Sequence, residues 1–586
     1  MEPRWNLDAL YPSFDSKEFQ ADFALFKKEL ADFGRWAREN FADTADATAK
    51  LETYIARVNA FRCPEKLGSY AMLVRSVDES DDAAKKYSDL LDGLFAETTC
   101  FTVPFKNFVG RLENLDGIIA SSKLLTEHAF LLREIKGQHR YLLSDKEEAA
   151  VAKLSTTGST AWTDMKDTLL ATMRIPVTVD GAEKSLPLPA VRNLAYDSRP
   201  EVRKAAYLAE IKSYETVEKA AAAALNAIKG EVLTLVKMRG YESPLDMTLV
   251  GARMERGTLD AMLNSVREFL PSFRRFFRKK AEVLGHKGGL PFYDLFAPVG
   301  KVAMKFSYAE ARDFILEHFY AYSGRLGDFA KTAFDGNWID AEVREGKRGG
   351  AFCANLHAVG QSRVMANFDG SFSNVTTLAH ELGHAYHGEC LKEQPALKTE
   401  YTMPIAETAS NFCETIITDA AIKKAGPEER FALIEAELSD SMQVIVDIYS
   451  RYLFECRFFE KRHSGSLSVA EICDLMLQAQ KDAYGDGLDP AWLHRYMWVN
   501  KVHYYYASSN FYNFPYTYGL LFSKGLYAKY LAEGPSFHAK YDSLLAATGS
   551  SSLEAVGDLA GIDVRTKDFW TSSLKLIQTK LDEFCR

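Results

Sequence analysis

Several hallmarks of membrane, secreted and nucleic-acid-binding proteins are absent from this sequence. No apolar run approaches the ~18 residues of a membrane span, and the opening Met1–Arg4 carries charge instead of the apolar core of a signal peptide. Basic residues do not outnumber acidic ones, since 71 Lys and Arg stand against 80 Asp and Glu, a net charge of −9. We therefore expect a cytoplasmic protein that binds neither a membrane nor a nucleic acid.

Paired cysteines, phosphate-binding loops and internal repeats are also missing. The sequence has no C-x-x-C pair, no G-x-x-x-x-G-K loop and no repeat, which argues against a cysteine zinc cluster, P-loop chemistry and a solenoid. In a long chain without a secretion signal, scattered cysteines are expected to be free thiols. The eight are Cys63, Cys100, Cys353, Cys390, Cys413, Cys456, Cys473 and Cys585.

The composition is that of an ordinary globular protein. Apolar residues make up 47% of the chain and charged residues 26%, values that do not fit a disordered segment. At 586 residues the chain exceeds what one hydrophobic core usually serves, so at least two lobes are expected.

The stretch from Leu378 to His387 carries the clearest chemical pattern, H-E-x-x-H. On a helix His380 and His384 share one face a turn apart, while Glu381 lies about 100° round the axis. This spacing predicts two metal ligands and, beside them, a base that is not a ligand. The alternative is a helix whose histidines are merely surface or satisfied core groups.

Other residues of this stretch support a helix with one packed face. An apolar stripe recurs at helical spacing, formed by Val375, Leu378, Leu382 and Ala385. Gly383 costs a helix interior about 1 kcal/mol relative to alanine. We therefore expect another element to pack closely at that position.

A third ligand is needed, and the segment Met403–Glu414 offers one. It reads as a second helix with Pro404 in its first turn, and Glu407, Asn411 and Glu414 share one face. Two histidines and a glutamate are a known zinc set in hydrolases. We predict Glu407 as the third ligand and Glu414 as a group that orients a ligand histidine, with a solvated helix face as the alternative for each.

Two short strand-like segments precede the metal helix, at residues 351–357 and 363–368. Such a sheet can offer its edge to an extended peptide, although a purely structural ribbon is the alternative. Residues 15 to about 140 have helical texture, and residues 175–188 read as a hairpin around Asp180-Gly181. The fold class that follows is mainly α, with a small β-sheet before the metal helix.

The segment 503–519 is an outlier, with many phenols together with one proline and one glycine. This composition is poor for a helix and suits a loop that lines a cleft. The alternative for Tyr504, Tyr505 and Tyr506 is an aromatic plug that packs two lobes together.

The motif His380–His387, followed by Ile405–Ser410, resembles the thimet-oligopeptidase-like zinc peptidases, and specifically their oligoendopeptidase F branch. Three further segments are similar to that branch: Trp5–Ser13, Arg348–Phe352 and Phe511–Tyr516. The resemblance implies a two-lobed helical fold with a deep substrate cleft, and activity on short unfolded peptides. It also implies that His503, Tyr512 and Tyr516 assist catalysis. More residues separate His503 from Tyr512 than the pattern expects, so Tyr505 or Tyr506 is an alternative donor.

These observations together predict a metalloendopeptidase with one zinc per chain, held by His380, His384 and Glu407. Zinc would lower the pKa of a water and polarise the scissile carbonyl, and Glu381 would carry a proton to the leaving amine. The expected division is an N-terminal helical region at 1–115, a subdomain with the hairpin at 116–195 and a catalytic domain at 196–586. The alternatives are a zinc hydrolase of a non-peptide substrate and an inactive helical binding protein.

Overall fold

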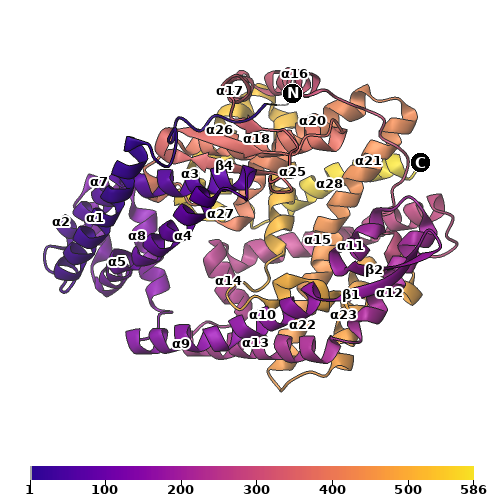
Figure 1. Ribbon diagram of the computed structural model, residues 1–586, viewed down its shortest axis with the longest axis horizontal. Helices are drawn as coiled ribbons and strands as arrows, with labels where there is room; N and C mark the ends of the chain where they lie inside the picture. The colour runs from indigo at the N-terminus through magenta and orange to yellow at the C-terminus, as the bar shows by residue number, and fades with distance from the viewer. Residues whose placement is uncertain (1–2) are drawn as a thin grey trace. The chain divides into compact units, whose positions relative to one another are not determined.

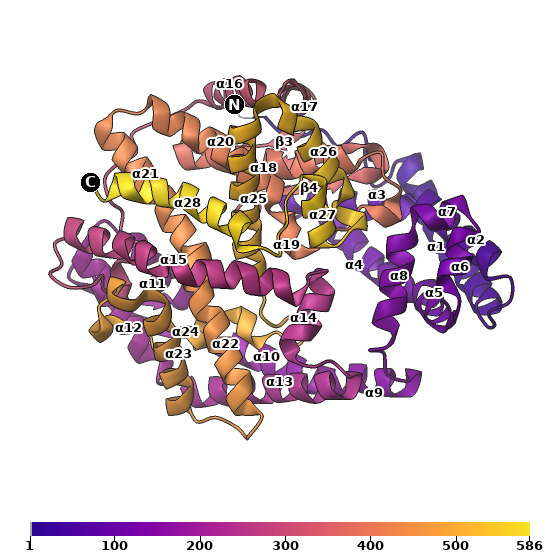
Figure 2. The ribbon, with the colours of Figure 1, turned by 180° about the vertical axis from the view of Figure 1, so that it is seen from behind.

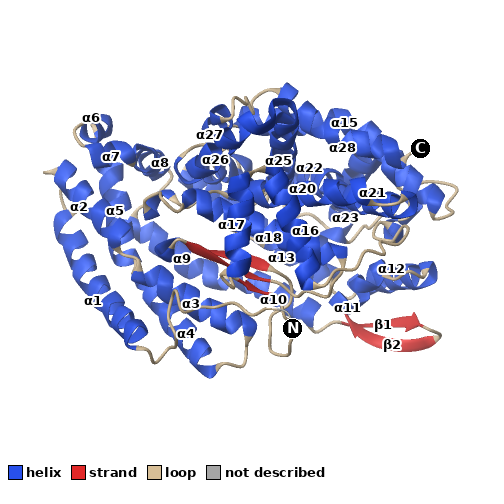
Figure 3. Cartoon of the chain, turned by 90° about the horizontal axis from the view of Figure 1, so that it is seen from above, coloured by secondary structure: helices blue, strands red, loops and turns tan. Residues whose placement is uncertain are grey.

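The computed structural model describes residues 3–586, and these fold mainly into helices (Figure 3). Strands are confined to a two-stranded hairpin and a three-stranded sheet. The predicted mainly α fold class is therefore confirmed. Among the described helices, none combines the length and apolarity that crossing a bilayer would require.

The chain divides into two compact units, each built from three separate stretches of sequence (Figure 1). The first comprises Met1–Arg140, Met304–Ala420 and Lys529–Ile562, and the second comprises Tyr141–Ala303, Ala421–Ala528 and Asp563–Arg586. The expectation of at least two lobes is thus met. The deep cleft implied by the family resemblance stays a prediction.

The first unit opens with a helical bundle whose core is rich in aromatic rings. In α1 (Lys17–Asn40) Phe19, Phe26 and Phe33 recur at seven-residue spacing and are fully buried, and the Ser16 side chain caps the helix by accepting from the Phe19 N–H. The following helices are α2 (Ala47–Ala60), α3 (Cys63–Val77), α4 (Asp82–Glu97), α5 (Thr99–Arg111), α6 (Leu115–Ala120), α7 (Lys123–Glu127) and α8 (Ala129–His139).

The remainder of the first unit carries the small sheet and the helix with the H-E-x-x-H motif. Its helices are α16 (Tyr308–Tyr322), α17 (Gly324–Asp335), α18 (Phe372–Leu391), α19 (Met403–Ala406), α20 (Thr408–Lys424), α26 (His538–Ala547) and α27 (Leu553–Leu559). The strands β3 (Ile339–Asp340), β4 (Phe352–Leu356) and β5 (Gln361–Met365) form a sheet in the order β3-β5-β4, with β4 antiparallel to β5. The predicted sheet before the metal helix is therefore present, and β4 is an edge strand.

The second unit is almost wholly helical. Its helices are α9 (Asp145–Thr157), α10 (Ser159–Ala171), α11 (Leu188–Asn193), α12 (Pro200–Tyr214), α13 (Glu218–Arg239), α14 (Pro244–Ala252), α15 (Arg256–Val283), α21 (Pro427–Met442), α22 (Ile448–Arg462), α23 (Val469–Tyr484), α24 (Met497–Asn500), α25 (Phe514–Glu533) and α28 (Lys567–Phe584). Helices α15 and α28 pack against each other (Figure 2).

The hairpin in the second unit follows the sequence prediction. Strands β1 (Arg174–Val179) and β2 (Ala182–Pro187) are antiparallel, and Val179 pairs with Ala182 across a two-residue turn. Asp180 and Gly181 both have positive φ, 58° and 74°, as this tight turn requires.

Helices α18 and α20 make backbone contact at Gly383. A Cβ on Gly383 would lie 2.5 Å from the carbonyl oxygen of Ala409 and 2.6 Å from the Cα of Ser410. Both distances are too short for non-bonded atoms, and both neighbours are backbone, which cannot rotate away. The close packing expected at Gly383 is confirmed.

Gly383→Ala should therefore destabilise the protein by about 1–3 kcal/mol, because the added methyl overpacks a contact between two backbones. The matched control is Gly93→Ala in α4, where a Cβ would meet nothing within 4 Å. That change should be neutral or slightly stabilising, since alanine is the better helix former. Thermal unfolding of both variants measures the difference, and equal melting temperatures would contradict the contact.

Candidate metal centre

Helix α18 presents two histidines on one face, one turn apart. The Ser371 side chain caps its N-terminus by accepting from the Asn374 N–H, which fixes where the helix begins. The ring centroids of His380 and His384 lie 4.9 Å apart. The H-E-x-x-H pattern thus forms the ligand-type pair that its spacing predicts.

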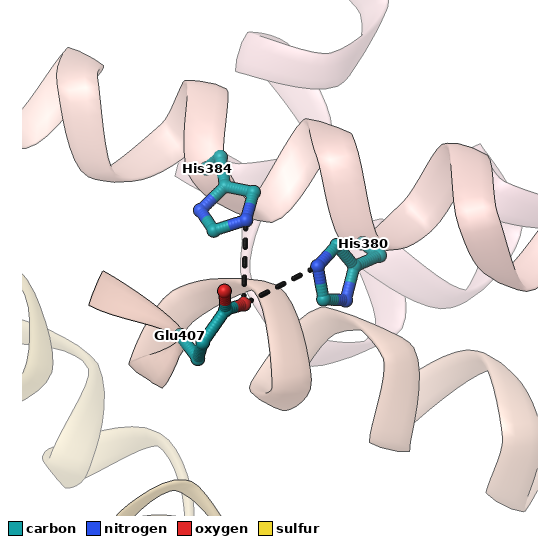
Figure 4. A group of neighbouring side chains, drawn as sticks. All are labelled: His380, His384 and Glu407. Atoms are coloured by element: carbon teal, nitrogen blue, oxygen red, sulfur yellow. Dashed lines mark ion pairs between the residues drawn. The ribbon is translucent and has the colours of Figure 1, made fainter. Parts of the chain in front are cut away.

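Glu407 faces both histidines (Figure 4). Its Oε2 lies 3.3 Å from His380 Nε2 and 3.4 Å from His384 Nε2, and the Ser410 hydroxyl donates to the same oxygen. One donor atom from each of the three residues falls within 4.8 Å of the others. The structure therefore brings together all three residues that the sequence predicts as ligands.

The element that carries Glu407 differs from the prediction. We expected one helix from Met403 through Glu414, but α19 ends at Ala406 and α20 begins at Thr408. Glu407 lies at the junction, with φ −87° and ψ 6°, in the sparsely populated bridge region. Its side chain is thus aimed by a break between helices and not by a regular helical face.

A fourth side chain completes the surroundings of His380. Glu414 Oε2 lies 3.1 Å from His380 Nδ1, so the ring meets one carboxylate at each nitrogen. Ligand histidines in metal sites ordinarily donate their second N–H to a carboxylate in this way. The donor set of two imidazoles and a carboxylate, with this additional partner, fits a bound metal cation such as zinc.

The pKa values of these residues reflect their mutual pairing. Burial lowers the pKa of His380, but hydrogen bonds with Glu407 and Glu414 outweigh it and raise the value to about 10. Burial raises the pKa of Glu407, but the hydrogen bonds with His380 and His384 hold it well below its usual range. The negative charge that favours a proton on His380 would equally favour a metal cation.

Glu381 is more buried than the three candidate ligands. It is only 6% exposed, and burial raises its pKa above the ordinary value although His380 and His384 oppose the shift. A carboxylate with a raised pKa is a better proton acceptor near neutral pH than an ordinary one. Glu381 is therefore suited to accept a proton, whereas His380, His384 and Glu407 are placed as candidate ligands.

The residues predicted from the tyrosine segment form a cluster of their own in the second unit. The His503 and Tyr512 rings stack at 4.5 Å, Tyr516 lies 6.1 Å from Tyr512, and Tyr506 lies 5.7 Å from both His503 and Tyr512. Asn513 Nδ2 donates to His503 Nδ1 over 2.9 Å. The structure brings His503, Tyr512 and Tyr516 together, and it adds Tyr506.

The other two tyrosines of this segment are buried. Tyr504 packs against Phe454, and Tyr505 lies beneath the Lys166 ammonium, which is 4.5 Å from its ring. Of the two alternative donors, Tyr506 is therefore the one that joins the cluster. The segment is also less loop-like than expected, because α25 begins at Phe514 with Pro515 in its first turn.

Comparison with known proteins decides the family. The model of "Peptidase family M3" matches residues 193–576, and the model described as "Oligopeptidase F" matches residues 112–175. The chain belongs to peptidase family M3. The predicted metalloendopeptidase class is thereby confirmed, and family M3 implies a metal ion at the active site.

Relatives of this M3 peptidase match it over nearly its full length. It is 24% identical to oligopeptidase PepF of Bacillus subtilis, over 99% of this chain and 87% of that protein. It is also 24% identical to an oligoendopeptidase F homolog of Lactococcus lactis, over 99% of this chain and 96% of that protein. The crystal structure of oligoendopeptidase-F from Enterococcus faecium superposes with a TM-score of 0.70 at 19% identity, over 96% of this chain and 98% of that one.

One group that sequence reasoning missed supports the tyrosine cluster of this M3 chain. The buried Lys229 ammonium donates to Glu455 and to Asn510, both over 2.8 Å, and Glu455 accepts the Phe511 N–H over 3.0 Å. Phe511 has a φ of +53°, which is unfavourable for an aromatic residue. The network holds this turn directly before Tyr512, and its members are too far apart in sequence for any local pattern to reveal them.

Glu414→Gln should weaken metal binding by roughly 10- to 100-fold, because it removes the charge behind His380 while leaving every proposed ligand in place. Glu393→Gln is the matched control, since Glu393 is exposed and lies in the loop after α18. Competitive zinc titration against a chromophoric chelator measures both affinities. Equal affinities in the two variants would show that Glu414 does not support the ligand histidine.

Proposed function

We propose that this M3 peptidase is a zinc-dependent endopeptidase that cleaves short, unfolded oligopeptides. The observation that carries the proposal is the convergence of His380, His384 and Glu407, with their donor atoms within 4.8 Å of one another. The names of the relatives, oligopeptidase and oligoendopeptidase, support the substrate class. One zinc ion per chain is proposed, with these three residues as its ligands.

Zinc held in this way supplies Lewis-acid chemistry, lowering the pKa of a water molecule and polarising a carbonyl. The protein's own contribution begins with Glu381, which takes the proton from the attacking water at its carboxylate and passes it to the leaving amine. Its raised pKa suits both steps, because the carboxylate is a stronger base and still releases the proton. Glu414 keeps the His380 ring oriented.

The edge strand β4 is the proposed binding surface for the peptide backbone. It pairs with β5 on one side and, among residues 3–586, with no strand on the other. The Asn355 side chain of β4 donates to the His384 carbonyl over 3.2 Å, which ties this strand to the metal-binding helix. An extended peptide added to β4 would be held through its backbone, with little dependence on its sequence.

The division into an N-terminal helical region at 1–115, a subdomain at 116–195 and a catalytic domain at 196–586 is also proposed. It is supported by the family models, which match 112–175 and 193–576. The cytoplasmic location and the absence of a nucleic-acid partner remain predictions.

Glu381→Gln should keep its zinc but lose turnover by several orders of magnitude, because it removes a base and not a ligand. His380→Ala, His384→Ala and Glu407→Ala should each lose most of the bound metal. A chelator should abolish the peptidase activity of the wild type. The assay uses a quenched short peptide, together with the same sequence inside a folded protein, which should resist cleavage. Normal turnover of Glu381→Gln would refute the mechanism, and efficient cleavage of the folded protein would refute the size limit.

Negative charge develops on the carbonyl oxygen during attack, and a hydroxyl donor placed there stabilises it. If the tyrosine cluster supplies that donor, Tyr512→Phe or Tyr516→Phe should lower kcat by roughly 10²–10³-fold with KM little changed. Tyr504→Phe is the control, because the buried Tyr504 hydroxyl has no hydrogen-bond partner among the described residues. Unchanged kcat in both test variants would move the assignment to His503 or Tyr506.

A further inference from the structure

The second unit contains a cavity of about 610 Å3 that the peptidase mechanism does not use. Its wall is formed by residues of α10, α11 and α12, the segment around Phe292 and the segment from His494 to Val502. All of the lining residues belong to this unit. The volume lies within the range of ordinary small-molecule sites.

Four cationic side chains line this cavity, and three of them lie near a carboxylate of the protein. These pairs are Lys166 with Asp167 at 3.0 Å, Arg203 with Asp294 at 2.7 Å, and Arg192 with Glu210 at 3.4 Å. The fourth cation is Lys501, whose ammonium forms no hydrogen bond or ion pair with residues 3–586. The wall therefore carries one cationic group without a partner.

The environment of Lys501 disfavours its protonated, charged form. Burial lowers its pKa to about 7, helped by Arg451 and Arg192, while Asp447 and Glu210 oppose the shift. An anion that entered the cavity would stabilise the protonated amine. A single unpartnered cation matches a singly charged carboxylate better than a doubly charged phosphate.

The side chains of Asn500 and His494, which also line the cavity, are engaged with a carboxylate of the protein. Asn500 Nδ2 donates to Glu210 Oε1 over 3.3 Å, and His494 Nε2 lies 3.4 Å from the same oxygen. Both residues are buried, at 8% and 2% exposed. Lys501 is therefore the charged group of this segment that is left to pair with a ligand.

The rest of the wall is apolar. Five aromatic side chains contribute to it: Tyr196, Tyr207, Phe292, Tyr293 and Phe296. A ligand that fits needs a carboxylate and an apolar or aromatic side chain. Its nitrogen should be uncharged, because the wall carboxylates Asp167 and Glu210 already face cations.

We propose that this cavity is a second ligand site that binds the carboxylate end of an apolar, N-acylated amino acid unit, with Lys501 pairing with the carboxylate. The same chemistry is offered by a free N-acyl amino acid and by the last residue of a peptide. The proposal does not depend on the identity of the metal or on the proposed role of Glu381.

Calorimetric titration of the zinc-loaded full chain with N-acetyl-phenylalanine and with its C-terminal amide tests the proposal. The acid should bind and the amide should bind at least tenfold more weakly, because only the acid can pair with Lys501. Lys501→Met should weaken binding of the acid by about tenfold or more, as expected for a charged hydrogen bond. Lys501→Arg should retain the preference for the acid, and the exposed Lys212→Met in α12 should behave as wild type.

Two further arms separate the possible sites and sources. His384→Ala should bind the acid as wild type does, because loss of binding there would place the ligand at the metal and overturn the proposal. A tripeptide ending in phenylalanine, titrated into His384→Ala and into His384→Ala with Lys501→Met, reports on the peptide source, and binding of the tripeptide that is lost with Lys501→Met supports the carboxylate site for peptides. Equal binding of acid and amide, or unchanged binding in Lys501→Met, overturns it.

The pH dependence distinguishes pairing with the amine from a merely structural role. Binding needs protonated Lys501, so the affinity of the wild type should be full at pH 6 and fall as pH rises to 9. Lys501→Arg should show no such fall, since arginine stays charged. His494 also lines the cavity, with Nε2 3.4 Å from Glu210 Oε1. The Lys501→Met variant shows how much of the pH dependence comes from groups other than the Lys501 amine. Melting curves of Lys501→Met show whether this variant is folded. Its stability should not fall, because the substitution removes a buried cation that has no partner.

Discussion

The contact between the backbones of α18 and α20 at Gly383 is the constraint on which the candidate metal centre depends. Only a residue without a Cβ leaves room for the Ala409 carbonyl and the Ser410 Cα, which lie where a side chain would begin. Helices separated by ordinary side chains run about 8–10 Å apart. At that spacing a residue at the start of the second helix would lie farther from the side chains of the first. Because α20 approaches this closely, Glu407, one residue before its start, reaches both histidines.

A second glycine fixes the same helix against the sheet. A Cβ on Gly388 would lie 2.3 Å from the Oδ1 of Asn355, whose Nδ2 donates to the His384 carbonyl. Positions 383 and 388 differ by about 140° round the helix axis, so α18 is held from two directions. The orientation of the two ligand-type histidines thus follows from close packing on two sides of the helix, against the α20 backbone at Gly383 and against the Asn355 side chain at Gly388.

Three glutamates near this helix occupy environments of different kinds. Histidine partners hold the pKa of Glu407 well below its usual range, whereas burial raises the pKa of Glu381. Glu414 interacts with the opposite nitrogen of His380. When neighbouring carboxylates are pushed apart in pKa by their surroundings, the division of roles follows: the one held charged suits a cation and the one held basic suits proton transfer.

Local patterns in the sequence were sufficient to predict the helix that carries the H-E-x-x-H motif, the hairpin at Asp180-Gly181 and the helix face that His380 and His384 share. Each of these features depends on residues only a few positions apart. They did not place Glu407 at a break between helices, because no glycine or proline follows Pro404 in the segment to Glu414 to mark one.

They also missed the support of Tyr512. Phe511 adopts a positive φ, which costs about 1–2 kcal/mol for a residue with a side chain. Glu455 accepts its N–H, and the buried Lys229 joins Glu455 to Asn510. Hydrogen bonds to charged groups contribute about 1.5–3 kcal/mol each, enough to offset the strain. The position of Tyr512 is therefore decided by α13 and α22, helices that precede it by many residues, and the tyrosine segment read by itself could not reveal it.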